Sequence, residues 1–336
     1  MTEVKFSIKT KTPLHIGGGR QTAFIDQTVF KIGDKPAIPG SAIKGKVRSI
    51  YEEEWRRRLT KCYSPVELAK KMREILEEAV EELEQYVPGL ASDFKRFAPD
   101  PEEEPYAYFP LVCDPLSELH CNPPEAVSDF GEDVRETIRL IASFILLRRS
   151  ATKHYCPACT YFGGNGHPSP LIFKAAESSE TQLGVTTRVS IDRYTGAAKQ
   201  ERLFSIEYVP PDVEFKGSVE LAEEVSQYVD RAEAEEFLNE VVPGLLERVK
   251  QIGKFKSVGF GVVEVKVDAK NGDTEEKVDA HIRREAMRRL CDDEELKGYL
   301  KNYIKRASEK YADAIAEVII KYRERVRREV WWLLGP

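Results

Sequence analysis

Cys156-Pro-Ala-Cys159 is the clearest chemical pattern in this sequence. Two cysteines separated by two residues can bring their thiolates to one ion with the tetrahedral geometry that zinc prefers. A structural zinc takes four ligands, and we expect Cys113 and Cys121 to supply the second pair, with His154 or His120 as alternatives. Buried thiols without a metal remain the competing interpretation. Thioredoxin-like redox chemistry is not favoured, because no βαβ pattern surrounds the motif.

A second candidate site lies within the first 48 residues, which hold nine Lys/Arg against three Asp/Glu in a chain of net charge -6. Gly17, Gly18 and Gly19 follow a predicted strand, and glycine lets a backbone approach a ligand closely. Ser41 is a suitable N-cap for a helix whose free N–H groups attract anions. Lys44 and Arg48 share one face of that helix, and Arg20 follows the glycines. This pattern indicates a phosphate-backbone site, and RNA is the polymer it fits best.

The length and composition of the chain limit its domain number, its cellular compartment and the position of any RNA-binding surface. The chain has 336 residues, enough for one large domain or two smaller ones. No apolar run approaches the roughly 18 residues of a membrane span, and no secretory segment is evident, so we expect a cytoplasmic protein without membrane contact. In a reducing cytosol the six cysteines indicate metal binding or free thiols. Residues 67–105 carry twelve Asp/Glu against five Lys/Arg, so any RNA path must avoid them.

The two candidate sites depend on the elements that position them. Alternating apolar residues predict strands, and a 3.6-residue period predicts helices. The order of these elements favours an α+β fold with a ferredoxin-like core. That core comprises residues 1–58 and 155–268, with a helical insertion at 59–154 and a helical extension at 275–336. The predicted strands are 3–10, 171–173, 202–209, 213–221 and 257–267. The predicted helices are 42–58, 65–97, 131–149, 231–252 and 275–334, and the helical pattern within 65–97 stops near Pro88-Gly89.

Four segments occur in an order that is similar to a known family: His15-Ile-Gly-Gly-Gly19, Ile38-Pro-Gly-Ser-Ala-Ile-Lys-Gly-Lys-Val-Arg48, Thr187-Arg-Val-Ser-Ile-Asp-Arg193 and Gly253-Lys-Phe-Lys-Ser-Val-Gly-Phe-Gly261. Together they resemble the RAMP superfamily of CRISPR proteins, and most of all the repeating backbone subunit of type III-A interference complexes. The resemblance covers the first 50 residues and about 155–268, so it says little about the insertion or the C-terminal extension.

The resemblance implies an RRM-like palm and a β-hairpin thumb, which would be residues 186–201 here. Copies of such a subunit stack along a CRISPR guide RNA together with other subunits, and each copy covers about six nucleotides. Single-stranded target RNA pairs with the guide and is cut opposite each copy by an aspartate with Mg²⁺. Asp26 stands at the matching place. The competing interpretation is a turn aspartate that caps its own backbone.

The resemblance also assigns RNA contacts. His15 would contact nucleic acid, although a strand-end histidine bonded to a nearby carbonyl is the alternative. Ile191 would wedge against a base, with Arg188 and Arg193 on phosphates, unless the segment is an ordinary surface hairpin. The loop with Lys254, Lys256 and two glycines resembles a second RNA-binding loop, and its alternative is a tight turn.

Three functions therefore compete. The first is an endoribonuclease subunit that cuts target RNA at Asp26, and the second is a scaffold that only orders the guide RNA. A guide-maturation enzyme that uses His15 as acid and base is the third, and it lacks an evident second proton carrier. We further expect Cys62 and Cys291 to pack in the interior, and His167 and His281 to lie at the surface.

Overall fold

The computed structural model describes residues 3–19, 25–121, 132–191, 198–268, 274–305 and 310–331. The chain divides into two compact units. We call them the sheet unit (Met1–Ile50, Leu171–Ala222 and Glu235–Val278) and the helical unit (Tyr51–Pro170, Glu223–Ala234 and Asp279–Pro336). Among the described residues, no helix combines the length and the apolar character needed to cross a membrane.

The sheet unit is built on antiparallel strands in the order β2-β3-β5-β8-β1-β9, with β4 also paired to β8. Strand β1 (Glu3–Thr10), which pairs with β8 and β9, is the strand predicted from alternating residues. Val4, Phe6 and Ile8 of β1 are buried, whereas the intervening residues face outward. The mixed α/β class with an antiparallel sheet is confirmed. The remaining strands are β2 (Lys31–Ile32), β3 (Lys35–Ile38), β4 (Leu171–Phe173), β5 (Ala176–Ser178), β8 (Glu214–Leu221) and β9 (Val263–Val267).

The segment 231–252 is not the single helix that was predicted, and its part from Phe237 onward packs on this sheet. It consists of α6 (Arg231–Glu236), a π-helical turn (Phe237–Val241) and α7 (Val242–Glu247). Pro243 has no N–H to donate to the preceding turn, and the backbone widens to a π-turn just before it. The last strand is also shorter than predicted, because Gly259 and Gly261 both have positive φ and residues 256–258 form a 3₁₀ turn.

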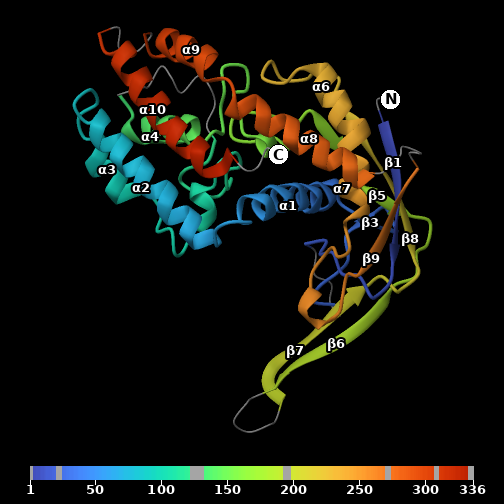
Figure 1. Ribbon diagram of the computed structural model, residues 1–336. Coiled ribbons are helices and arrows are strands. Elements are labelled where there is room, and N and C mark those ends of the chain that lie inside the picture. Colours follow the sequence, from blue (N-terminus) through green and yellow to red (C-terminus); the bar gives the residue numbers. More distant parts are fainter. Residues whose placement is uncertain are drawn as a thin grey trace. The chain divides into compact units, whose positions relative to one another are not determined.

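A long two-stranded ribbon belongs to the same unit. It pairs β6 (Gly184–Ile191) with β7 (Ala198–Tyr208), and Thr187 stands opposite Ser205. The ribbon extends past the end of the main sheet (Figure 1). Its strand β7 starts earlier than the predicted 202–209. Residues 192–197 of the hairpin predicted over 186–201 lie outside the described residues.

Helix α1 (Gly40–Leu59) begins two residues earlier than predicted, so Ser41 lies inside the helix and is not its N-cap. The carbonyl of Pro39 accepts from the amides of Ala42 and Ile43. Gly40 explains this start, because a Cβ on Gly40 would lie 1.8 Å from the carbonyl oxygen of Phe173. The chain therefore enters α1 pressed against β4, where only glycine fits.

The helical unit packs its helices around a common interior. The helical pattern within 65–97 stops before Gly89, as predicted, and a second helix begins after this residue, whose φ of +89° favours glycine. The helix predicted over 131–149 and the predicted C-terminal extension are present as shorter helices. The elements are α2 (Pro65–Leu83), α3 (Leu90–Phe97), a 3₁₀ turn (Pro105–Tyr108), α4 (Val134–Ile145), α5 (Pro157–Phe162), α8 (Thr274–Leu290), α9 (Asp293–Lys305) and α10 (Ala312–Val330).

Candidate metal centre and nucleic-acid interface

Four cysteines come together in the helical unit. The sulfur atoms of Cys113, Cys121, Cys156 and Cys159 lie within 4.8 Å of one another, and all four residues are buried. Cys113 Sγ lies 3.5 Å from the sulfurs of Cys156 and of Cys159. Tetrahedral zinc–thiolate bonds of about 2.3 Å place sulfurs about 3.8 Å apart, so this donor set fits such an ion. All four are free thiols.

The local sequence explains how the Cys156–Cys159 pair is shaped. Cys156 is the N-cap of α5, and its sulfur accepts from the amide of Cys159 at 3.5 Å. Pro157 takes the first helical position, where the missing N–H is not needed. A Cβ on Gly164 would lie 3.1 Å from Cys159 Sγ, so this glycine leaves room for the sulfur.

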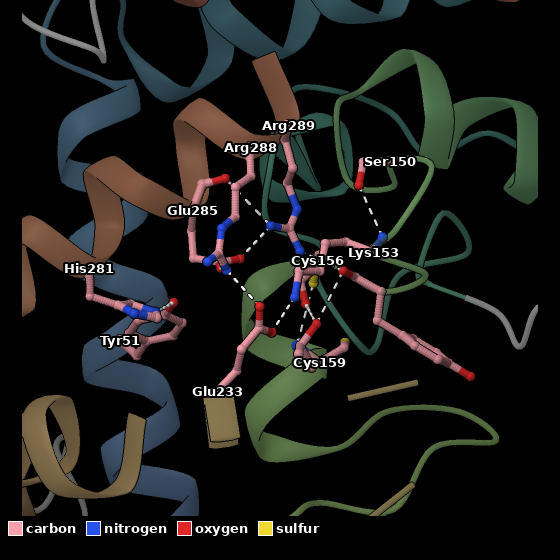
Figure 2. A network of polar contacts seen from close by, with 12 residues as sticks. Tyr51, Ser150, Lys153, Cys156, Cys159, Glu233, His281, Glu285, Arg288 and Arg289 are labelled. Carbon is pink, nitrogen blue, oxygen red and sulfur yellow. Dashed lines mark hydrogen bonds and ion pairs between the residues drawn. The ribbon is translucent and has the colours of Figure 1, made fainter. Parts of the chain in front are cut away.

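Two buried arginines fix the segments that carry the cysteines. Arg148 donates to the carbonyls of Ala107, Phe109 and Leu119, and so holds the backbone on both sides of Cys113. Arg289 donates to the carbonyl of Tyr155 at 2.9 Å, directly before Cys156 (Figure 2). A metal bound by four thiolates carries a net negative charge, and buried cations near it offset part of that charge.

Arg289 belongs to an ionic network on α8 in which Arg289 and Glu285 are buried and Arg288 is exposed. It pairs with Glu285, and Arg288 bonds both Glu285 and Glu233, which also pairs with Lys153 (Figure 2). Burial alone would raise the pKa of Glu285, but the adjacent Arg289 guanidinium lowers it to about 2. This carboxylate therefore stays ionised and satisfies the buried guanidinium.

His281 lies on the same helix and faces Tyr51, whose hydroxyl oxygen is 3.1 Å from His281 Nε2 (Figure 2). It is 5% exposed, and burial lowers its pKa to about 4. The prediction of surface positions for His281 and His167 was wrong, since both are buried. Conversely, Cys62 and Cys291 are exposed and do not pack in the interior. These four residues carry no periodic pattern that could have placed them correctly.

The two alternative metal ligands lie outside the cysteine group. His120 Nδ1 is 2.7 Å from the carbonyl oxygen of Ser117. The ring of His154 packs edge-on against Tyr228. The first-choice set of four cysteines is therefore the one that the fold brings together.

In the sheet unit, the glycine run serves close backbone packing. The amide of Gly18 donates to the carbonyl of Thr28 at 2.9 Å, and Gly17 forms a bridge with Val29. A Cβ on Gly18 would lie 2.8 Å from the carbonyl oxygen of Val29. Gly19 has a φ of +70° and open space around it. Of the three glycines that were predicted to contact RNA, Gly19 is therefore the one with open space beside its Cα.

His15 is fully buried beside this run. Its Nδ1 lies 2.7 Å from the carbonyl oxygen of Glu207, which matches the strand-end alternative. Burial is the main cause of its lowered pKa, and the charge of Lys254 adds to it. The amide of Lys254 donates to the carbonyl of His15, and the exposed Lys254 side chain lies beside Gly17. The glycine run and the loop at 253–261 are therefore interlocked.

The guanidinium of Arg188 on β6 packs against two aromatic rings in the same region, a contact that was not predicted from the sequence. Its guanidinium carbon lies 5.2 Å from the ring centre of Phe255 and 5.0 Å from that of Phe260. Phe255 also packs on His15 and has a positive φ of 61°. In the sequence, the position of Phe255 between Lys254 and Lys256 could have indicated this contact. Arg20 and Arg193 lie outside the described residues, and only the backbone of Ile191 is described.

Asp26 is exposed, and its carboxylate is bonded mainly to Ser205 on β7, with a smaller contribution from its own backbone amide. Oδ2 accepts from the amide of Ser205 at 2.7 Å and from its hydroxyl at 3.0 Å. The hydrogen bond from the Ser205 amide is the main cause of the lowered pKa of Asp26. The carboxylate is therefore ionised at neutral pH. It offers the charge that a divalent cation needs.

Lys44 and Arg48 lie side by side on α1, as their spacing predicts. Burial lowers the pKa of Lys44, and the charge of Arg48 lowers it further. Two adjacent cations repel each other, and an anion between them relieves that repulsion. Ser41 is exposed one turn before Lys44.

These features agree with what comparison with protein families shows. The model of the RAMP superfamily matches residues 7–264, which is most of the chain. The chain belongs to the RAMP superfamily. No curated protein matches it.

Solved structures provide two further similarities. The first is a chain of the type III-B Cmr-beta complex bound to cognate target RNA, with 14% identity and a TM-score of 0.36. The match covers 80% of this chain and 60% of that one. The second is a chain of type III-B Cmr-beta in its apo state, with 14% identity and a TM-score of 0.35, covering 80% of this chain and 98% of that one.

Proposed function

We propose that this chain is a guide-RNA-binding backbone subunit of a type III CRISPR effector complex, and that it cuts target RNA at regular intervals. The observation that carries the proposal is the match of residues 7–264 to the RAMP superfamily. Its partners would be CRISPR guide RNA, single-stranded target RNA, copies of itself and other subunits of the complex. The family resemblance favours the type III-A form of this subunit.

The RNA-binding surface would comprise the cationic segments of the sheet unit. Lys44 and Arg48 on α1 have the charge and spacing for phosphates, and exposed Lys254 and Lys256 lie in a loop interlocked with the glycine run. Phosphate contacts of this kind bind RNA with little sequence preference. The proposed set is His15, Gly17, Gly18, Gly19, Arg20, Ser41, Lys44, Arg48, Arg188, Ile191, Arg193, Lys254 and Lys256, in which His15 acts from beneath the surface.

Cleavage would depend on Asp26 and Mg²⁺. Mg²⁺ supplies charge stabilisation at the scissile phosphate when bound. An exposed, ionised carboxylate fits one ligand position of this ion, which in proteins takes one or two carboxylates together with phosphate oxygens. The role of Asp26 would be to hold the ion, while the RNA supplies the other ligands. Replacing Asp26 with Asn in the assembled complex tests this role.

A scaffold without cleavage activity is the second candidate, and one observation favours it. The hydrogen bonds from Ser205 give Asp26 a structural task, namely attaching its loop to β7. If that were its only task, Asp26→Asn would alter local stability and leave cleavage to other subunits. Guide maturation by His15 has less support, because the imidazole is fully buried.

The four cysteines would hold a structural zinc ion. Their burial, their mutual distances and the absence of an open ligand position in the set all support a closed site. Cys113, Cys121, Cys156 and Cys159 would bind as thiolates and tie three stretches of the helical unit together. Metal analysis of the purified chain tests this assignment.

The domain arrangement follows from the same proposal. Residues 1–58 and 155–268 would form a ferredoxin-like core with the thumb at 186–201. Residues 59–154 would be a helical insertion linked to the core by zinc, and 275–336 a helical extension. The antiparallel sheet with α7 packed against it supports the core assignment.

A further inference from the structure

Asp26 is joined to β7 by three hydrogen bonds, and all of them involve Ser205. The amide and the hydroxyl of Ser205 donate to Asp26 Oδ2 at 2.7 and 3.0 Å. The amide of Asp26 donates back to Ser205 Oγ at 3.2 Å. Within the part of the chain that the structure describes, both bonds to the carboxylate from another residue end on Oδ2, and none from another residue ends on Oδ1. The backbone amide of Asp26 itself also contributes a hydrogen bond to the carboxylate.

The backbone around Asp26 is fixed in the same way. The amide of Gln27 donates to the carbonyl of Ser205 at 3.1 Å, and the amide of Glu207 donates to the carbonyl of Gln27 at 2.9 Å. The Glu207 carboxylate then accepts from the amide of Val29 at 2.9 Å. Residues 26–29 therefore run along β7 like an added strand, with both polar backbone groups of Ser205 turned toward them.

When one carboxylate is the only protein ligand of a cation, cation binding depends on the orientation of that carboxylate, because no second protein ligand can compensate for a misplaced oxygen. Neighbouring hydrogen bonds usually set such orientations, and their removal weakens metal binding. Here two donors on one oxygen fix the carboxylate plane and leave the other oxygen available. Ser205 also ties this geometry to β7, the strand that continues into the hairpin.

We propose that Ser205 is a positioning residue for Asp26: its amide and hydroxyl hold Oδ2 and leave Oδ1 available to a divalent cation on the target RNA. This inference deepens the proposed function and rests on it. Ser205 itself touches neither the RNA nor the ion. Its hydroxyl is the part that substitution can remove, because the amide remains in every variant.

The experiment uses the reconstituted complex with a target RNA that lacks the 2′-hydroxyl at each scissile position. Mn²⁺ binding to this uncleavable complex is titrated by electron paramagnetic resonance, and single-turnover cleavage of the ordinary target is measured in parallel. Ser205→Ala should weaken the Asp26-dependent Mn²⁺ site and slow cleavage, each about tenfold. Target binding should stay within about twofold. Ser205→Thr keeps the hydroxyl and should restore both values, and Ser7→Ala on β1 is the matched serine control.

The variant Asp26→Ala distinguishes a failure of the proposed function from a failure of the inference about Ser205. If it changes neither Mn²⁺ binding nor cleavage, the proposed function fails, whatever Ser205 does. If Asp26→Ala abolishes both while Ser205→Ala behaves as wild type, the positioning inference is overturned and the proposed function stands. Ser205→Thr that behaves like Ser205→Ala would also overturn it, because the hydroxyl would then not be the active group.

A second measurement on the free full-length chain tests the hydrogen bond itself. Deuterium exchange at the Ser205 amide should become about tenfold faster in Asp26→Ala, because the amide loses its acceptor. The amide of Ile206, the next residue along β7, provides the internal reference. Unchanged exchange at Ser205 would show that the bond does not hold the carboxylate, and would overturn the inference.

Discussion

The sulfur atoms of Cys113 and Cys156 lie 3.5 Å apart although 43 positions separate them in the sequence. Between them run α4 and the Pro-rich stretch before it, so the two cysteines meet only when the helical unit is folded. Arg148 and Arg289 fix the two backbones from opposite segments. An ion that joins these cysteines therefore stabilises the fold of the whole unit.

The first prediction concerns this metal. Protein purified without added metal should contain one zinc per chain, measured by inductively coupled plasma mass spectrometry. Cys156→Ser should lower the melting temperature by about 10 °C or more, because structural zinc contributes folding free energy directly. Exposed Cys62→Ser is the matched control and should change it little. Metal-free protein with an unchanged melting temperature would contradict the site.

The second prediction compares two glycines of α1. Gly40→Ala should lower the free energy of unfolding by about 3 kcal/mol, because the new Cβ would stand 1.8 Å from the carbonyl oxygen of Phe173. Gly45→Ala, in the same helix with open space around it, should raise that free energy by about 1 kcal/mol. Urea unfolding measures both. Equal effects of the two substitutions would show that the helix does not start against β4.

The third prediction is a loss of stability in acid. The pKa of His281 is about 4 in the folded chain and near 6.5 when unfolded, so between these values the unfolded state binds more protons. Stability therefore falls as pH decreases, by about 2 kcal/mol between pH 7 and pH 5 from this group. Glu285 adds a loss in the same direction below about pH 4.5, because its pKa is lowered to about 2.

His281→Asn should reduce this pH dependence between pH 7 and pH 5, whatever its effect on stability at neutral pH. The cations Arg284, Arg288 and Arg289 near His281 oppose its protonation and remain in the variant. Chemical unfolding at a series of pH values measures the slope. A variant with the full wild-type slope would assign the acid sensitivity to other groups.

The fourth prediction concerns RNA binding. Replacing both Lys44 and Arg48 with Ala should weaken binding of unrelated single-stranded RNAs by similar factors, because phosphates carry no sequence information. The slope of log affinity against log salt should decrease by about 1.4, which corresponds to two lost phosphate contacts on a single strand. Lys46→Ala, on another face of α1, is the control. Filter binding in which the double variant equals wild type would refute this phosphate site.

Local patterns predicted part of this structure, and tertiary contacts decided the rest. Strand β1 could be predicted because each alternate residue is buried against the helices, which leaves a clear period of two. The Cys156–Cys159 spacing indicated the metal site, since the ligand geometry is local. Ser41 was wrongly expected to cap α1, because the actual start depends on how Gly40 meets Phe173, far away in sequence.

The dependence on tertiary contacts also explains why some residues of the sites were not predicted from the sequence. Ser205 has no local signature, and Phe255 has only its place between Lys254 and Lys256. The importance of both arises from pairing with Asp26 and Arg188 on other segments. His281 was expected at the surface, yet the fold buries it against Tyr51. Pro243 could in principle have predicted the break in the 231–252 helix.

The most direct test of the account is target cleavage by the reconstituted complex with Asp26→Asn. The variant keeps the shape of the side chain and removes its charge, so guide and target binding should remain at or slightly above the wild-type level. Asp34→Asn, an exposed aspartate in the turn between β2 and β3, is the matched control. With labelled target RNA and Mg²⁺, wild type and Asp34→Asn should give products spaced about six nucleotides apart, the period that the family resemblance implies. Asp26→Asn should lower this periodic cleavage by orders of magnitude, because the ion at the scissile phosphate loses its protein ligand. Unchanged periodic products from Asp26→Asn would contradict the cleavage role and leave the scaffold function in its place.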